Sequence, residues 1–111
     1  MELESKFRLT KEGEKIFGNG PCLLLETVRK LGSLSKAAKE LNMSYSKAWS
    51  MINRSEKALG CLLIDTQIGG TGGGGSNLTP VAEYLIKAYR DFYKEAIYIL
   101  DVLYRKYFEG F

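Results

Sequence analysis

The sequence predicts a single, mainly α-helical domain that carries a small β-hairpin and ends in a long helix. Three observations support this fold class. Apolar residues recur every three or four positions between residues 19 and 59, as they do in amphipathic helices. Two short β-type segments, at 61–68 and 76–79, enclose a run of glycines. A helical pattern then continues from Pro80 to about Phe108.

The length and composition are those of one ordinary globular domain. The 111 residues are 45% apolar and 26% charged, which suits a packed core rather than a disordered chain. No apolar run approaches the roughly 20 residues that span a bilayer. The first residues, MELESKFRL, lack the apolar core of a signal peptide. We therefore expect a cytoplasmic protein without a membrane partner.

The first element is a strand or a short hairpin, and the second is a helix. The segment KFRLTKEGEKIFG, residues 6–18, mixes β-type residues with a central glycine. The segment NGPCLLLETVRKLG follows, with Asn19 as a capping candidate and Pro21 in the first turn. Helical spacing places Leu24, Leu25, Val28 and Leu31 on one face, and Gly32 ends the run.

Two more helices follow at close spacing. Ser33 or Ser35 caps the first of them, which presents an apolar face of Leu34, Ala37, Ala38 and Leu41. Asn42 and Met43 form a tight turn, and Ser44 caps a third helix that Gly60 closes. The inward stripe of this third helix is predicted to comprise Ala48, Ile52, Ser55 and Leu59.

The last helix is predicted to start where Thr79 caps it and Pro80 takes its first position. At 1.5 Å per residue, 80–108 spans about 40 Å, so its far half extends past the core of so small a domain. An antiparallel pairing of two copies is the economical way to cover its apolar positions; a fold-back near residues 104–108 is the alternative. The predicted stripe consists of Val81, Leu85, Ala88, Tyr89, Phe92, Ala96, Ile99, Leu100, Leu103, Tyr107 and Phe108.

The positive charge is concentrated in one part of the chain. The net charge is only +3, and residues 1–28 and 80–111 are close to balanced. Residues 29–60 hold only two acidic residues, Glu40 and Glu56, against the basic residues Arg29, Lys30, Lys36, Lys39, Lys47, Arg54 and Lys57. This segregation indicates a polyanionic partner that docks on the second and third helices.

The order of elements matches a winged helix-turn-helix. The second and third helices, joined by a short turn, form the helix-turn-helix, and the hairpin 61–79 behind them is the wing. In this arrangement the third helix enters the major groove of DNA, because that groove admits one α-helix. Residues 6–79 are then the DNA-binding core with its wing, and 80–108 are the dimerisation helix.

The outward face of the third helix supplies candidate DNA contacts. An asparagine can bond adenine with two hydrogen bonds, while arginine and lysine bond guanine or phosphate. At the start of the second helix, free N–H groups and nearby hydroxyls favour a phosphate. A merely solvated face is the alternative for each residue, and Trp49 belongs either to the core or to the contact surface. The candidates are Ser35, Lys36, Ser44, Tyr45, Ser46, Lys47, Ser50, Asn53, Arg54 and Lys57.

The glycine run suits a wing tip that lies against a phosphate chain, because it offers backbone amides and little bulk. A flexible linker is a compatible alternative. A phosphate-binding loop of an enzyme is excluded by pattern, because no lysine follows the glycines and no βαβ unit surrounds them. The candidate contacts at the tip are Thr71, Gly72, Gly73, Gly74 and Gly75.

The absence of histidine argues against catalysis and metal binding. Without histidine, Ser/His/Asp and Cys/His nucleophiles are impossible. Cys22 and Cys61 stand far apart beside leucines and are interpreted as small buried thiols rather than a disulfide or metal ligands. We expect a protein that is not an enzyme and that holds no cofactor.

The stretch GSLSKAAKELNMSYSKAWSMINRSEKALGCLLIDTQIGGTGGGGSNLTPVAEYLIKAY resembles the DNA-binding domain of the ModE family of molybdenum-responsive transcriptional regulators. More distantly the chain is similar to LysR-type regulators, and the resemblance covers about residues 6–108. It implies a homodimer that binds two half-sites of double-stranded DNA. ModE regulators carry molybdate-binding domains after this helix, whereas this chain stops at Phe111, so molybdate sensing transfers to no residue here. A separate effector-sensing protein, a different signal and constitutive binding all stay open.

Three functions are therefore weighed. A DNA-binding transcriptional regulator is favoured by the basic window and the wing. A winged-helix module that binds other proteins and ignores DNA is the runner-up, and a gel shift with mixed-sequence duplex separates the two. A nucleotide-binding enzyme would require stabilisation by nucleotide in a thermal-shift screen. The operator, the regulated genes and the direction of regulation are not encoded in any pattern of the sequence.

Overall fold

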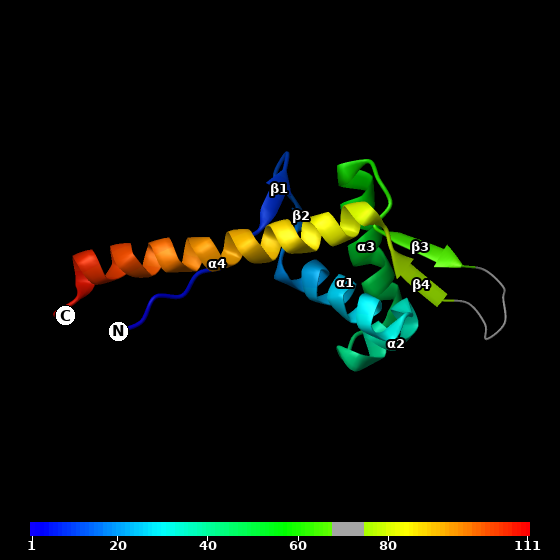
Figure 1. Cartoon of the computed structure of the whole chain (residues 1–111), viewed down its shortest axis with the longest axis horizontal. Coiled ribbons are helices and arrows are strands. Elements are labelled where there is room, and N and C mark those ends of the chain that lie inside the picture. The colour runs from blue at the N-terminus through cyan, green and yellow to red at the C-terminus, as the bar shows by residue number, and fades with distance from the viewer. Residues whose placement is uncertain (68–74) are drawn as a thin grey trace.

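The computed structural model describes residues 1–67 and 75–111, and its helices and strands follow the predicted order (Figure 1). The wing and the C-terminal end of the long helix lie at opposite ends of the molecule, which measures 61 × 29 × 23 Å. The fold class is the predicted one, mainly helical with small antiparallel hairpins. The elements are β1 (Leu9–Lys11), β2 (Glu14–Phe17), α1 (Asn19–Leu31), α2 (Leu34–Glu40), α3 (Tyr45–Leu59), β3 (Ile64–Gln67), β4 (Gly75–Leu78) and α4 (Pro80–Phe108).

The segment before α1 is a hairpin, which the sequence left open against a single strand. β1 and β2 pair antiparallel, with a bulge between Leu9 and Thr10. The two residues between the strands, Glu12 and Gly13, both have left-handed φ values, 52° and 83°. A two-residue turn of this kind matches the twist of the flanking strands. The hairpin ends at Phe17, whose fully buried ring meets Tyr89 of α4 edge-on at 5.5 Å.

The ends of α1 agree with the prediction at one terminus only. Gly32 ends the helix in the left-handed conformation, as expected. The N-cap, however, is Gly18 and makes no side-chain capping bond, so the prediction that Asn19 caps this helix is wrong. The Asn19 Oδ1 atom instead accepts a hydrogen bond from the guanidinium of Arg90, at 2.8 Å. The same guanidinium forms an ion pair with Glu26, which joins α1 to α4.

The helix-turn-helix pair has the predicted caps. Ser33 and Ser44 accept hydrogen bonds from the N–H groups of Lys36 and Lys47 and so cap α2 and α3. Asn42, between the helices, adopts a left-handed φ of 55°. The inward face of α3 consists of Ala48, Ile52 and Ser55, as predicted, but Leu59 is 38% exposed because it lies in the last turn, beyond the core.

The core side of α4 differs from the predicted stripe. The buried residues of α4 are Ala82, Ile86 and Tyr89, of which the prediction included only Tyr89. Thr79 caps the helix, as expected, and its hydroxyl also donates to the Leu62 carbonyl. Residues of the predicted stripe lie instead on a neighbouring face, which is largely exposed. They include Val81, Phe92, Ile99 and Leu103.

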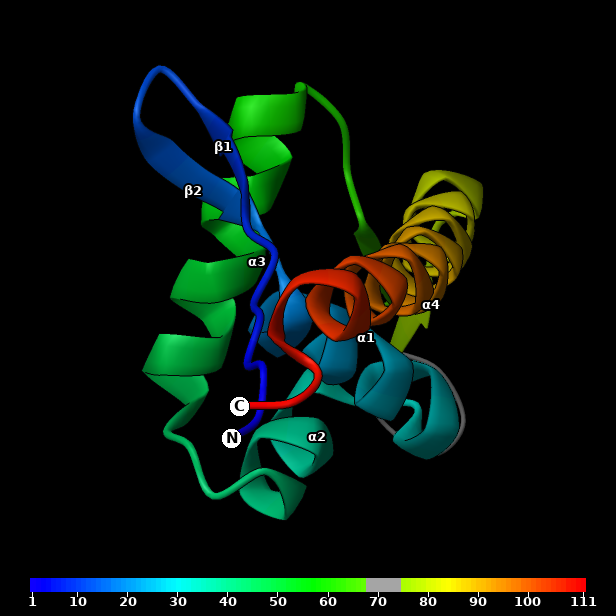
Figure 2. The same cartoon turned by 90° about the vertical axis from the view of Figure 1, so that its left-hand side faces the viewer.

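The N-terminal segment, residues 1–7, runs beside α4 (Figures 1 and 2). Tyrosine hydroxyls of α4 hold it: Tyr89 donates to the Phe7 carbonyl at 2.8 Å, and Tyr104 donates to the Met1 carbonyl at 2.6 Å. The Phe7 ring also contacts Phe92 and Tyr93 edge-on. The far half of α4 is therefore covered on one side by the N-terminal segment of the same chain.

The two cysteines occupy different environments. Cys22 is buried in the core, and burial raises the pKa of its thiol to about 11. Cys61 is only half-buried, so the prediction of two buried thiols holds for Cys22 alone, because Cys61 follows the last turn of α3 at the edge of the core. Over residues 1–67 and 75–111, no helix is long and apolar enough to cross a membrane.

Candidate nucleic-acid interface

The outward face of α3 brings together most of the predicted contact residues. Ala48, Ile52 and Ser55 fix the helix to the core, so the opposite side faces solvent. The Ser55 hydroxyl adds a hydrogen bond to the Ile16 carbonyl of β2. Asn53 is half-buried at the margin of the exposed side. The exposed predicted residues on or next to α3 are Ser44, Tyr45, Ser46, Lys47, Ser50, Arg54 and Lys57.

The start of α2, which precedes α3 in the sequence, carries two further predicted contact residues. Ser35 and Lys36 are both exposed. Because Ser33 performs the capping, the Ser35 hydroxyl is not needed for that role. This arrangement leaves a hydroxyl and an ammonium group at the positive end of the helix, where anions are favoured.

Trp49 lies outside the core. Its side chain is 52% exposed, close to the 55% of Tyr45 one turn earlier on the same side of α3. Of the two alternatives left open for Trp49, the structure excludes the core. The buried residues of α3 are Ala48, Ile52 and Ser55, so position 49 lies outside the inward stripe.

The wing is attached to the helices at two points. On one side, the Glu56 carboxylate of α3 accepts hydrogen bonds from the backbone N–H groups of Leu63 and Ile64, at 2.8 and 3.3 Å. On the other side, the Ser76 N–H of β4 donates to the Gly32 carbonyl at 2.9 Å. β3 and β4 themselves pair antiparallel from Ile64 with Leu78 to Gln67 with Gly75. These hydrogen bonds hold the base of the wing in a defined position relative to α3.

Gly75 has a structural reason to be glycine. A Cβ atom added there would lie 3.1 Å from the Gly32 carbonyl oxygen, which is part of the backbone and cannot move aside easily. The lack of a side chain at Gly75 therefore allows β4 to approach the α1–α2 turn. This structural reason holds independently of any contact between Gly75 and DNA. The other predicted tip residues, Thr71, Gly72, Gly73 and Gly74, lie outside the described residues.

A family comparison agrees with this arrangement. The family model of bacterial regulatory helix-turn-helix proteins of the lysR family matches residues 23–83, which is more than half of the chain. The chain belongs to this lysR family. The matched range runs from α1 through α2, α3 and the wing into the first turn of α4. Membership in a family of regulators agrees with the expectation that the chain is not an enzyme.

Curated relatives confirm the resemblance to ModE regulators. This lysR-family chain is 38% identical over 89 residues to the DNA-binding transcriptional dual regulator ModE of Escherichia coli K12. That match covers 78% of this chain and 34% of the relative. The molybdenum transport protein ModE of Herbaspirillum seropedicae is 37% identical over 68 residues, which cover 61% of this chain and 25% of that protein. The chain therefore spans about a quarter to a third of the length of these relatives.

Solved structures share the fold. A ZitR variant of Lactococcus lactis matches with a TM-score of 0.54 at 14% identity, covering 96% of this chain and 72% of that one. ArgP of Mycobacterium tuberculosis matches with a TM-score of 0.53 at 22% identity, covering 77% of this chain and 30% of that one. At such identities, the likeness concerns the fold of the lysR-family domain alone.

Sequence reasoning missed the residues that position the interface. In the sequence Glu56 is only one of two acidic residues in a basic segment, yet in the fold it anchors β3 to α3. Arg29, counted among the basic residues, is paired with Glu83 at 2.6 Å and joins the end of α1 to the start of α4. The one sign of this role in the sequence is that Glu56 is an acidic residue surrounded by basic ones. No group of histidine, cysteine or acidic residues in the described part of the chain is arranged to hold a metal ion.

Proposed function

We propose that this chain is the DNA-binding part of a transcriptional regulator and binds double-stranded DNA with α3 in the major groove. The observation that carries the proposal is the exposed polar and basic side of α3, held between a firmly packed inner face and an anchored wing. The names of the ModE relatives as transcriptional regulators support it. Base edges would be contacted by α3, and the wing would lie on the adjacent backbone or minor groove.

Two residues of α3 would contribute most to sequence choice. Asn53 lies at the margin of the exposed side, and Arg54 is exposed beside it. Each good bidentate contact with a base is worth about 1–3 kcal/mol of discrimination. Lys36, Lys39 and Lys57 would contact phosphates and make the affinity depend on salt.

The proposal includes a homodimer formed through α4. The exposed apolar stripe repeats at steps of three and four along the helix and follows the spacing of a helix–helix seam. A symmetric pair would cover this stripe and present two α3 helices to two half-sites. The residues proposed for the seam are Val81, Leu85, Ala88, Phe92, Ala96, Ile99 and Leu103, of which Leu85 and Ala96 are half-buried.

The test compares wild type with the Asn53→Ala/Arg54→Ala double variant on two duplexes. One duplex is selected from a random pool by the wild-type protein, and the other has a scrambled sequence. We expect the double variant to bind the selected duplex more weakly, by about 1–3 kcal/mol for each of the two lost contacts, with a smaller loss on the scrambled one. Fluorescence anisotropy at fixed salt gives both affinities.

A Glu40→Ala variant on the exposed side of α2 controls for general damage to the fold. Equal affinities of the double variant and the wild type for both duplexes would show that α3 does not read the sequence. If the wild type bound no duplex at low salt, the proposed DNA-binding function would be rejected, although the fold would stand.

A further inference from the structure

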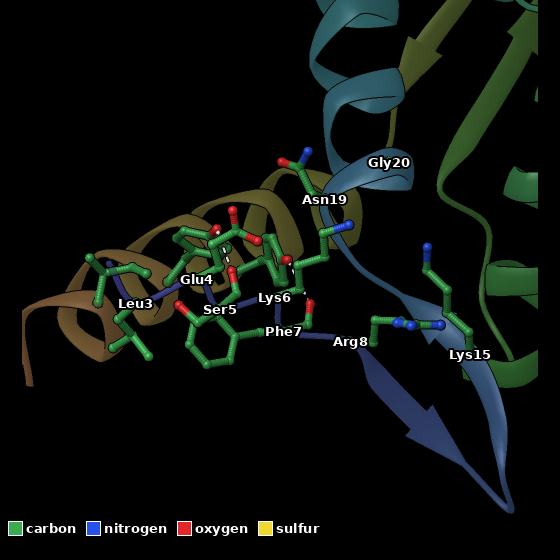
Figure 3. A pocket seen from close by; sticks show the side chains of 12 residues that line it. Leu3, Glu4, Ser5, Lys6, Phe7, Arg8, Lys15, Asn19 and Gly20 are labelled. Carbon is green, nitrogen blue, oxygen red and sulfur yellow. Dashed lines mark hydrogen bonds between the residues drawn. The ribbon is translucent and has the colours of Figure 1, made fainter. Parts of the chain in front are cut away.

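A large open cavity lies away from the outward face of α3. It is a trough of about 980 Å³ bounded by the N-terminal segment, β2, the first turn of α1 and α4 (Figure 3). We call it the N-terminal trough. Its apolar wall is formed by Leu3, Phe7, Tyr89, Tyr93 and Ile97. The tyrosine hydroxyls of this wall donate to main-chain carbonyls of the segment, so both sides of the trough are fixed.

Three cations line the N-terminal trough, and only one carboxylate does. Lys6, Arg8 and Lys15 contribute the positive charges, and Glu4 is the single acidic residue. Within the described ranges 1–67 and 75–111, none of the three cations forms an ion pair. Figure 3 shows Lys6 and Lys15 extending toward the first turn of α1, while Arg8 extends toward β2. Three positive charges against one negative charge leave the lining with a net positive charge, which a bound anion would complement.

The Lys15 side chain lies against Gly18, at the start of α1. A Cβ atom at Gly18 would lie 3.1 Å from the Lys15 Cε atom and 3.5 Å from its Nζ atom. Gly18 has an extended φ of 175°, which any residue adopts, so its conformation does not require glycine. The missing side chain instead provides the space in which the ammonium group lies against the start of α1.

We propose that the N-terminal trough binds a small, multiply charged oxyanion of the phosphate type through Lys6, Arg8 and Lys15. Two lysine ammonium groups and a guanidinium supply many donors and no acceptor, which suits tetrahedral oxyanions. The family match begins at residue 23, so the N-terminal segment and β2 lie outside it.

A phosphate group has a second source, the backbone of DNA. Lys15 also lines a small cavity with Arg54 of α3, so the trough is connected to the proposed DNA-contacting surface. The trough itself is lined by the N-terminal segment, Lys15, the first turn of α1 and α4, and by no described residue of α3 or the wing. This location favours a free anion over the phosphate chain that α3 and the wing would follow.

The experiment is an NMR titration of the full chain with inorganic phosphate at constant ionic strength, which removes general screening effects. We expect saturable shifts of the backbone amides of Phe7, Lys15 and Gly20. The Lys6→Gln/Arg8→Gln/Lys15→Gln variant should bind at least about tenfold more weakly, because each lost charged hydrogen bond contributes substantially. A variant with Lys30→Gln, Lys94→Gln and Lys106→Gln has the same charge change outside the trough and should bind like wild type.

A second variant tests the site without changing its charge. Gly18→Val fills the space beside Lys15 with more than the single Cβ that a small shift of Lys15 would avoid, and it should weaken phosphate binding, while thermal unfolding reports whether the fold survives. Absence of saturable shifts, or equal affinity in both charge variants, would overturn the proposal. Shifts of the same amides with mixed-sequence duplex but not with phosphate would assign the cations to DNA and overturn it as well. The duplex affinity of the wild type, measured separately, tests the proposed function independently.

Discussion

Glu56 illustrates how a single side chain sets the geometry of the interface. Its carboxylate accepts hydrogen bonds from the N–H groups of Leu63 and Ile64, so the last turns of α3 hold the first residues of the wing. The Ser76 N–H and the Gly32 carbonyl provide the second attachment. If the wing follows the DNA backbone while α3 occupies the groove, these few bonds determine the angle between them.

Replacing Glu56 with alanine tests this role. The substitution leaves two N–H groups at the start of β3 without their acceptor, and each unsatisfied buried donor costs about 1–3 kcal/mol. We expect a lower free energy of unfolding in urea by an amount in this range, and weaker duplex binding at equal salt. Glu40→Ala removes the same charge from an exposed position on α2 and should change stability little. Equal unfolding curves for the two variants would show that Glu56 is not an anchor.

Local residue chemistry was predictable where it acts within a few positions. Ser33, Ser44 and Thr79 cap their helices because an N-cap oxygen needs only the N–H groups that follow it. Asn19 was mispredicted because its partner, Arg90, lies on another helix. The anchoring role of Glu56 was missed for the same reason, since it depends on the path of the chain after Gly60.

At the scale of elements, α4 carries two apolar faces rather than one. Positions 82, 86 and 89 face the core, and the N-terminal segment continues this side through Tyr104. At about 100° per residue, positions 81, 92, 99 and 103 lie on a neighbouring side that is largely exposed, although the Phe7 ring contacts Phe92 there. The sequence pattern does not separate these two faces, because the apolar residues of both recur every three or four positions. The helix boundaries, in contrast, were predicted well, since caps and prolines mark them.

The uncovered side of α4 predicts a specific effect on assembly. An Ile99→Asp/Leu103→Asp variant places two carboxylates in the proposed seam, where burial of an unpaired charge is costly. We expect wild type to sediment at twice the 12.5 kDa mass of the chain and the variant to sediment as a monomer over the same concentrations. Lys94→Asp, on the opposite side of the helix, should stay dimeric. A variant that sediments at the same mass as a dimeric wild type would place the dimer contact elsewhere. A wild type that is monomeric at all concentrations would exclude the dimer.

At the scale of the whole molecule, the fold changes the meaning of the charge pattern. The basic window 29–60 was visible in the sequence and reaches the surface on α2 and α3. Residues 1–28 appeared neutral, yet the fold gathers Lys6, Arg8 and Lys15 around one cavity. Charge segregation along the chain therefore predicted the face of the helix-turn-helix pair and gave no indication of the N-terminal trough, which only the packing of the N-terminus on α4 creates.

The elongated shape also makes the central claim directly testable. The wing lies at one end of the molecule and the exposed seam of α4 runs to the other, so a two-fold pair would separate two equivalent α3 helices (Figure 1). Hydroxyl-radical footprinting of wild type on a duplex selected from a random pool is the measurement that tests this most directly. The account predicts two protected patches, symmetric about a centre and spaced by about one helical turn, ~10 base pairs, or a multiple of it. A single protected patch, or weak protection that does not depend on sequence, would contradict it.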